Sequence, residues 1–353
     1  MTMMEKNKNL KNSTGAKLLF YGALKEVISG FPKRSQEIIT MRFGINGKNP
    51  QTLEAIGKHY QISRERVRQI IKETIKKMKL EKNRVFLDLA FQKIKFTVKQ
   101  NSGIISRKEL LAKLSENPKE QGVIEFLLNC ASELEFKKEK GKLKDSVVLA
   151  DFNFDSWRKT VRQVKLILEE EKKAFKSDQL FRKALSRGIK RDKKEFFHCL
   201  SVSEEVQKNN FGKWGLAQWS EINPKGIREK TFLVMKEIRK PFHYKEVANL
   251  IEKYGLGKKR VHPQTVHNEL IKDDRFVLVG RGKYALAEWG YKKGTVKDVL
   301  EEILSGSGKP MEQEDIINKV LSLREVKAST VLVNLNNFFE RVGGNKYTVK
   351  KSV

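Results

Sequence analysis

Residues 52–78 contain two helical patterns that meet at a short turn, and this feature most limits what the chain can fold into. Leu53 and Ile56 follow Thr52 at helical spacing, and a threonine in that position can cap a helix because its hydroxyl accepts an unpaired backbone N–H. The turn spans residues 60–62. Two short helices joined by so short a turn are typical of a helix-turn-helix.

The second helix of this pair has one apolar side and one polar side. Ser63 can cap it in the same way as Thr52 caps the first helix. Apolar or buried-type residues recur at three- and four-residue intervals, and these are Val67, Ile70, Ile71, Thr74 and Met78. The opposite side carries Arg64, Glu65, Arg68, Gln69 and Lys72. Arginine can bind guanine, glutamine adenine and glutamate cytosine, so the pattern predicts a DNA-recognition helix. A charged, solvated face on an ordinary helix is the alternative.

A resemblance favours the recognition helix. Two segments resemble region 4 of the bacterial sigma-70 family of RNA polymerase initiation factors. They are FPKRSQEIITMRFGI at residues 31–45 and TLEAIGKHYQISRERVRQI at residues 52–70. The resemblance implies that the MRFG part and the helix before it dock on the polymerase flap, and that the second helix-turn-helix reads the promoter −35 element. The family usually has an acidic residue where this chain has Ile71, which puts the local contact there in doubt.

The resemblance also implies a set of contact residues. Carried over residue by residue, Arg64, Glu65, Arg68 and Gln69 would contact bases and phosphates, and Arg66 would contact the DNA backbone. Together with the cap and the basic residue one turn further on, the predicted DNA-binding set is Ser63, Arg64, Glu65, Arg66, Arg68, Gln69 and Lys72.

The charge balance of the whole chain also indicates a nucleic-acid partner. The 353 residues contain 73 Lys and Arg against 43 Asp and Glu, a net charge of +30. A folded protein this basic is expected to meet a polyanion, although a general enrichment in lysine is an alternative. The excess is spread over the whole chain, which favours several surfaces near nucleic acid over one basic tail. Double-stranded DNA and the flap of core RNA polymerase are therefore the predicted partners.

Other classes of protein are disfavoured by what the sequence lacks. Cys130 and Cys199 lie far apart beside apolar residues, so we expect buried free thiols and neither a disulfide framework nor a zinc site. No apolar run approaches the ~18 residues of a membrane span, and the first residues do not resemble a signal peptide. We find no paired carboxylates, catalytic triad or metal cluster. We therefore expect a cytoplasmic protein that is not an enzyme and needs neither cofactor nor metal.

A repeat occupies the rest of the chain. Three stretches are alike, and they are GKWGLAQWSE at 212–221, GKYALAEWGY at 282–291 and NKYTVKK at 345–351, with a weaker copy, GKLKDSVVLADF, at 141–152. Each consists of a turn with Gly or Asn, a lysine, an aromatic or apolar residue and a short strand. Helical patterns precede each copy. Three helices followed by a two-stranded hairpin predict a winged helix.

The predicted fold is mainly α, with a helix-turn-helix similar to sigma region 4 followed by tandem winged-helix domains, each of three helices plus a two-stranded wing. The expected segments are a disordered tail at 1–15, the sigma-like module at 16–80, and winged helices at 81–152, 153–221, 222–291 and 292–353. We call the last four the first to fourth winged segments.

The third winged segment resembles the HARE-HTH domain, the winged helix of the RNA polymerase delta subunit. The words that carry this resemblance are REKTFLVMKEIRKPFHYKEVANLI and VHPQTVHNELIKDDRFVLVGRGKYALAEWGY, at 228–251 and 261–291. Winged helices bind DNA through the third helix and the wing. The polar residues at those two places are Lys258, Lys259, Arg260, His262, Gln264, His267, Asn268, Arg281 and Lys283. Tandem winged helices that dock proteins are the alternative.

Three functions are consistent with these patterns. The first is a DNA-binding, bacterial-type transcription regulator that engages promoter DNA, RNA polymerase or both. It would not melt promoters alone, because the sequence shows no counterpart of sigma region 2. The second is a delta-like, polymerase-associated protein that competes with sigma factors without reading sequence. The third is a specificity subunit of a restriction or modification enzyme. The target site, the direction of regulation and the oligomeric state stay open.

Overall fold

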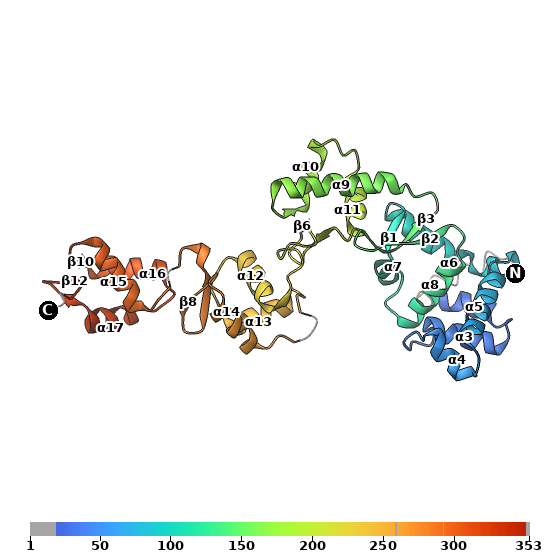
Figure 1. The fold of residues 1–353 in the computed structure, drawn as a ribbon, viewed down its shortest axis with the longest axis horizontal. Helices are drawn as coiled ribbons and strands as arrows, with labels where there is room; N and C mark the ends of the chain where they lie inside the picture. Colours follow the sequence, from blue (N-terminus) through green and yellow to red (C-terminus); the bar gives the residue numbers. More distant parts are fainter. Residues whose placement is uncertain (1–18, 258–259, 292, 351–353) are drawn as a thin grey trace, which may run out of the picture. The chain divides into compact units, whose positions relative to one another are not determined.

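The computed structural model describes residues 19–257, 260–291 and 293–350, and these form mostly α-helices with small three-stranded sheets (Figure 1). The tail expected at residues 1–15 lies outside the described residues. The chain divides into two compact units. One comprises the described residues up to Lys173 together with Asp178–Gln207, and the other comprises Ala174–Ser177 and the residues from Lys208 onward.

The sigma-like module contains four described helices. They are α2 (Leu19–Ile28), α3 (Lys33–Phe43), α4 (Leu53–Tyr60) and α5 (Arg64–Met78). Helix α3 ends at Gly44, which adopts a left-handed conformation with φ of 68°. Glycine suits this position because a side chain there would be strained. The sequence GINGKNP at residues 44–50 follows and separates α2 and α3 from α4 and α5.

Each of the four winged segments has the same order of elements: helix, strand, helix, helix, strand, strand. The first contains α6 (Glu81–Gln100), β1 (Ile104–Ser106), α7 (Arg107–Leu114), α8 (Pro118–Cys130), β2 (Leu134–Glu139) and β3 (Leu143–Leu149). The second contains α9 (Phe154–Glu171), β4 (Phe175–Lys176), α10 (Ser177–Ser186), α11 (Lys193–Ser201), β5 (Val206–Lys208) and β6 (Lys213–Leu216).

The third and fourth winged segments lie in the second compact unit. The third contains α12 (Gly226–Ile238), β7 (Phe242–His243), α13 (Tyr244–Lys253), α14 (Pro263–Lys272), β8 (Phe276–Gly280), β9 (Lys283–Leu286) and a short 3-10 turn, η3 (Ala287–Trp289). The fourth contains α15 (Val296–Ser307), β10 (Met311–Glu312), α16 (Gln313–Leu323), α17 (Ala328–Phe338), β11 (Glu340–Arg341) and β12 (Lys346–Thr348). This order confirms the mainly α, winged-helix fold class.

The sheets explain the sequence repeat. Their strand orders include β1-β3-β2, β7-β9-β8 and β10-β12-β11, so the last strand is central. The recurring aromatic residue of each copy pairs with the first strand of its sheet: Trp214 with Phe175, Tyr284 with Phe242 and Tyr347 with Met311. All three aromatic side chains are buried. The repeat therefore marks the central strand of each sheet, where the wing hairpin pairs with the first strand.

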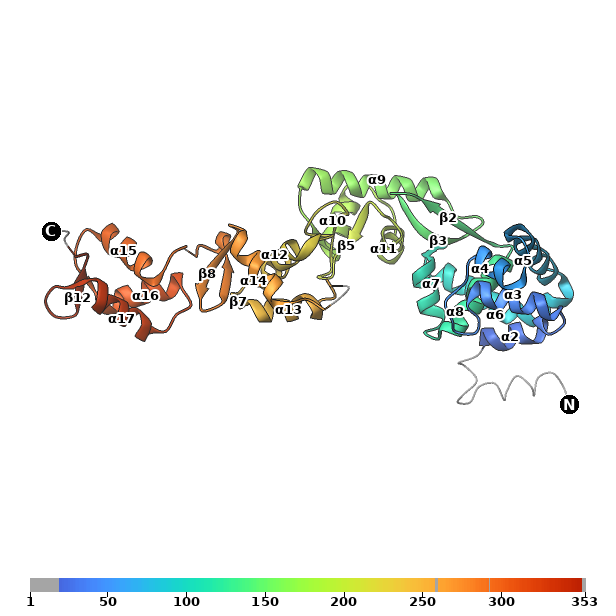
Figure 2. The same ribbon diagram turned by 60° about the horizontal axis from the view of Figure 1, so that its bottom comes forward.

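The hydrophobic core does not break at residue 80. One cluster of buried side chains runs from Phe20 in α2 to Val147 in β3, and α8 contacts α2, α3 and α5 (Figure 2). The buried Glu120 of α8 accepts hydrogen bonds from the backbone N–H groups of Phe20 and Tyr21, at 3.2 and 2.8 Å. It thus caps the start of α2. The sigma-like module and the first winged segment therefore share one core. The segment boundaries given above are proposed from the sequence.

Gly122 allows α8 to approach the end of α3. A Cβ atom there would lie 2.5 Å from the carbonyl oxygen of Phe43, and backbone cannot swing aside as a flexible side chain can. We expect Gly122→Ala to lower the free energy of unfolding by about 1–3 kcal/mol. Gly22→Ala is the matched control, because Gly22 is also helical but has no atom within 4 Å of such a Cβ. Urea unfolding curves showing equal stability for both variants would contradict the close approach.

The two cysteines are free and buried, as predicted. Burial raises the pKa of the Cys130 thiol to about 12 and that of Cys199 to about 11. The Cys199 backbone oxygen accepts a hydrogen bond from the buried indole Nε1 of Trp157 at 2.9 Å. Both residues serve as core.

Candidate nucleic-acid interface

Helices α4 and α5 form the predicted helix-turn-helix. The Thr52 hydroxyl accepts the Ala55 N–H and the Ser63 hydroxyl accepts the Arg66 N–H, both at 3.1 Å. Each hydroxyl satisfies a donor that the first turn of a helix leaves unpaired. Gln61 makes the turn in the left-handed region, with φ of 54°. Two local capping signals and one tight turn therefore fix where α5 begins.

The angle between α4 and α5 depends on Gly57. A Cβ atom at this position would lie 2.7 Å from the carbonyl oxygen of Ile62, so only glycine lets the backbone segments approach this closely. The Ile62 N–H donates to the Gly57 carbonyl at 3.0 Å. On the side of α5 that faces the core, Val67 and Met78 are buried.

The outer side of α5 is open. All seven residues of the predicted DNA-binding set are exposed. They are therefore all accessible around the N-terminal turns of α5, and we call this set of seven residues the α5 face.

Two side-chain pairs organise the α5 face. The Arg68 guanidinium donates two hydrogen bonds to the Glu65 carboxylate, at 2.8 and 2.6 Å, and these hold the pKa of Glu65 below its usual value. Arg66 donates to the Gln69 side-chain oxygen at 3.2 Å and lies 3.9 Å from Glu73. Exposed pairs of this kind are weak. Arg68 can therefore exchange its Glu65 partner for a base or phosphate.

A cluster on α3 holds the end of α4 in place. The Tyr60 hydroxyl donates to the Glu37 carboxylate at 2.7 Å, while Arg34 donates to the Tyr60 carbonyl at 3.2 Å and lies over the ring. Partial burial and the Glu37 hydrogen bond raise the pKa of Tyr60 to about 12. The turn before α5 is thus fastened to the rest of the module.

In the third winged segment, α14 is the counterpart of α5. Gln264 bridges to Asn268 and His267 at 3.4 Å. The His267 ring stacks on Tyr244, with ring centres 4.5 Å apart. Gln264 and Asn268 are exposed, whereas His267 is half-buried. The predicted basic residues Lys258 and Lys259 lie outside the described part of the chain.

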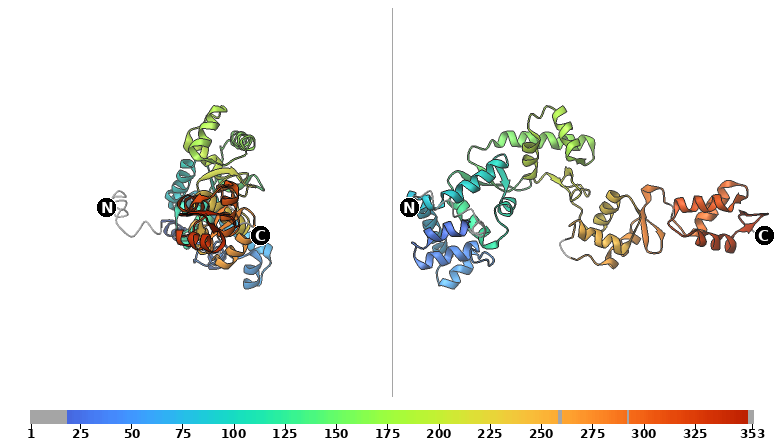
Figure 3. Two further views of the ribbon diagram at one scale, coloured as in Figure 1. Left: turned by 90° about the vertical axis from the view of Figure 1, so that its left-hand side faces the viewer. Right: turned by 180° about the vertical axis from the view of Figure 1, so that it is seen from behind.

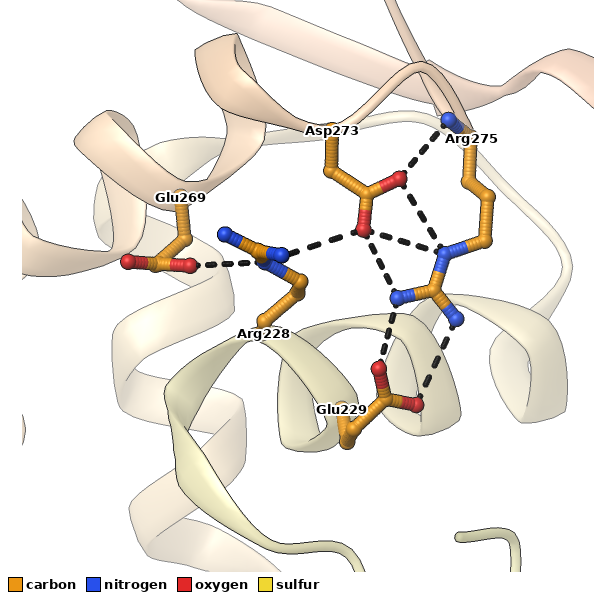
Figure 4. A network of polar contacts seen from close by, with 5 residues as sticks. All are labelled: Arg228, Glu229, Glu269, Asp273 and Arg275. Carbon is orange, nitrogen blue, oxygen red and sulfur yellow. Dashed lines mark hydrogen bonds and ion pairs between the residues drawn. The ribbon is translucent and has the colours of Figure 1, made fainter.

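An ionic network sets the position of α14 (Figure 4). Arg275 donates to Glu229 of α12 and to Asp273, both at 2.7 Å, and Arg228 donates to Glu269 at 2.8 Å. The hydrogen bonds from Arg275 hold the pKa of Asp273 below its usual value. Glu269, Asp273 and Arg275, at and just beyond the end of α14, therefore form ion pairs that hold this helix against α12. The sequence pattern did not predict these ion pairs.

The described residues contain neither a metal-binding cluster nor a membrane-spanning helix. Within residues 19–257, 260–291 and 293–350, no three His, Cys, Asp or Glu side chains are placed to hold a metal ion. In the same part of the chain, no helix combines the length and the apolar character needed to cross a membrane.

Comparison with protein families agrees with the architecture. Residues 27–80 match the family model for sigma-70, region 4. Residues 227–289 match the model for HARE-HTH, a helix-turn-helix domain named in part after ASXL proteins and restriction endonucleases. The first match contains the whole α5 face and the second contains α14. Both are helix-turn-helix families that bind DNA, and together they cover about a third of the chain.

Proposed function

We propose that the protein is a bacterial-type transcription regulator that binds duplex DNA through the α5 face. The observation that carries this proposal is the exposure of Ser63, Arg64, Glu65, Arg66, Arg68, Gln69 and Lys72 on one helix that has a rigid turn behind it. An α-helix fits the major groove, where arginine and glutamine side chains can distinguish base pairs. The helix would give readout, and surrounding cations would add affinity for phosphates.

Engagement of RNA polymerase is the second part of the proposal. The match to sigma region 4 supports docking of α3 and the MRFG residues on the polymerase flap. We propose that the chain acts together with a polymerase that is otherwise able to open promoters, and that it neither melts DNA nor catalyses a reaction. Purified protein and core polymerase that made specific transcripts without another sigma factor would contradict this part.

Selection of bound sequences from a random DNA pool, with and without core polymerase, is the experiment that tests the proposal. We expect one enriched motif in both conditions. Core polymerase should raise the yield of bound DNA. Recovery of random sequences in both conditions would exclude sequence reading by α5.

A docking protein without sequence preference is the second candidate. One observation favours it: α8, the third helix of the first winged segment, is buried against α2, α3 and α5 rather than open to a groove. At least one winged segment therefore serves as support. Co-purification with core polymerase combined with an unselective pool would favour this candidate.

Arg68→Ala tests readout by a single side chain. We expect a loss of about 1–3 kcal/mol on the selected site and a relaxed preference at one base pair. The matched control is Lys76→Ala, an exposed cation further along α5, which should weaken all sequences alike. Gel shifts with selected and random duplexes measure both effects. Equal losses on the two duplexes for Arg68→Ala would argue against base contact by Arg68.

A further inference from the structure

The wing of the first winged segment is bonded to the second. The Lys144 N–H donates to the Val202 carbonyl at 2.9 Å, and the Glu204 N–H donates to the Lys142 carbonyl at 2.8 Å. The Glu204 carboxylate also accepts the N–H of Gly141, in the hairpin turn, at 2.7 Å. The hairpin is therefore extended by the chain that follows α11.

The wing of the second winged segment contacts the third through side chains. From the turn before β6, Asn210 donates to the Tyr254 carbonyl at 2.6 Å, and the Phe211 ring lies 4.5 Å from the Tyr254 ring. Lys213 on β6 donates to Glu237 of α12 at 2.6 Å, and both side chains are largely buried, with 24% and 12% exposed. A hydrogen bond, a ring contact and an ion pair thus join residues 210–213 to the third winged segment.

The wing of the third winged segment is covered by the fourth. The Glu325 N–H donates to the Val279 carbonyl of β8 at 3.2 Å, and the side chain of the buried Arg324 donates to the Leu278 carbonyl at 2.9 Å. Lys283 of β9 pairs with the Glu325 carboxylate at 2.8 Å. A Cβ atom on Gly280 would lie 2.8 Å from the Glu325 carbonyl oxygen, so the two backbones are in close contact.

We infer that the wings of the first and third winged segments are connectors, each fastening its segment to the next one along the chain, that the wing strand β6 of the second segment packs on the third, and that none of these three wings contacts nucleic acid. The backbone hydrogen bonds of the first and third wings, and the close approach at Gly280, require one fixed register between the two segments, which a chance surface contact would not supply. A wing that holds a neighbour cannot also enter a groove. This inference differs from the sequence-based prediction that Arg281 and Lys283 form a DNA-binding wing tip, and Lys283 instead pairs with Glu325.

The fourth wing provides an internal comparison. Its hydrogen bonds run within its own segment: Val342 N–H to the Lys346 carbonyl at 2.9 Å and Arg341 Nε to the Gly344 carbonyl at 2.7 Å. Arg341 and Lys346 are exposed. If wings contribute to DNA affinity at all, this is the wing whose cations should matter.

Amide hydrogen exchange in the full chain tests the connectors without DNA. We expect the Lys144, Glu204 and Glu325 N–H groups to exchange at least about tenfold more slowly than the exposed amides of the fourth wing tip, at residues 343–345. Arg324→Ala should speed exchange at Glu325 about tenfold or more and leave Lys144 and Glu204 unchanged. Fast exchange at all three amides in the unmodified protein would overturn the inference, and that result needs no variant to fold.

DNA binding by wing variants gives the second measurement. Although the inference concerns the proposed DNA-binding function, the exchange measurement stands even if no DNA binds. We expect Arg281→Ala to leave the affinity for duplex DNA within about twofold of the unmodified protein and the salt dependence unchanged. Arg341→Ala is the matched change on the fourth wing, and the loss of DNA affinity that it causes is the reference value. A loss of about fivefold or more for Arg281→Ala, with a shallower salt dependence, would show that the third wing reaches the phosphates.

Discussion

Raising the salt concentration from 50 to 200 mM should weaken binding of the protein to duplex DNA by about a thousandfold or more. Each phosphate that a protein neutralises adds about −0.9 to the slope of log affinity against log salt, so about six phosphates give this loss. Helix α5 alone exposes enough cations, and they are Arg64, Arg66, Arg68, Lys72, Lys76 and Lys77. Residues 1–80 contain 17 Lys and Arg against six Asp and Glu.

Fluorescence anisotropy of a labelled duplex at several salt concentrations measures this slope. Arg66→Ala should make the slope shallower by about one, because Arg66 is predicted to contact the DNA backbone. Gln69→Ala is the control, since it removes a side chain from the same face without removing a charge. A slope between zero and about −2 for the unmodified protein would mean that the α5 face does not lie on a duplex.

Local patterns predicted much of the fold. The spacing of Val67, Ile71 and Met78 placed the buried side of α5 correctly, because side chains three or four residues apart lie on the same side of a helix. The recurrence of Trp214, Tyr284 and Tyr347 predicted the winged segments, and each residue proved to lie at the centre of a sheet. The first signal needs only neighbouring residues, and the second needs only a comparison of short stretches along the sequence.

Long-range contacts were not predicted. Glu120 bonds to backbone groups about 100 residues earlier in the chain, and Arg324 bonds to a carbonyl 46 residues away. No spacing rule identifies such partners. A partial signal did exist in α8, where Val123, Ile124 and Phe126 belong to a helix that is apolar on more than one side. A helix of that kind is buried all round, which an isolated winged helix does not require.

The burial of α8 links the first winged segment to the DNA-binding helix, and Phe126→Ala tests that link. Phe126 is fully buried, and its ring meets the Phe43 ring of α3 edge to face at 5.2 Å. Removing a buried phenyl ring costs about 3–5 kcal/mol. One core joins α2, α3, α5 and α8, and the blue to green ribbon of this part of the chain lies together in Figure 3. We therefore expect this loss throughout the described part of residues 19–149.

Hydrogen exchange in moderate urea distinguishes a shared core from two separate ones. In Phe126→Ala, peptides from α5 and from α8 should both lose protection, and by the same free energy, because they open together. Phe96→Ala is the matched control: this phenylalanine of α6 is 59% exposed, and its loss should change stability by no more than about 0.5 kcal/mol. The four tryptophans all lie beyond residue 152, so their fluorescence reports separately on the later segments. Protection lost in α8 but kept in α5 would show that the helix-turn-helix stays folded when α8 is destabilised. The first winged segment would then not be needed to stabilise the α5 face.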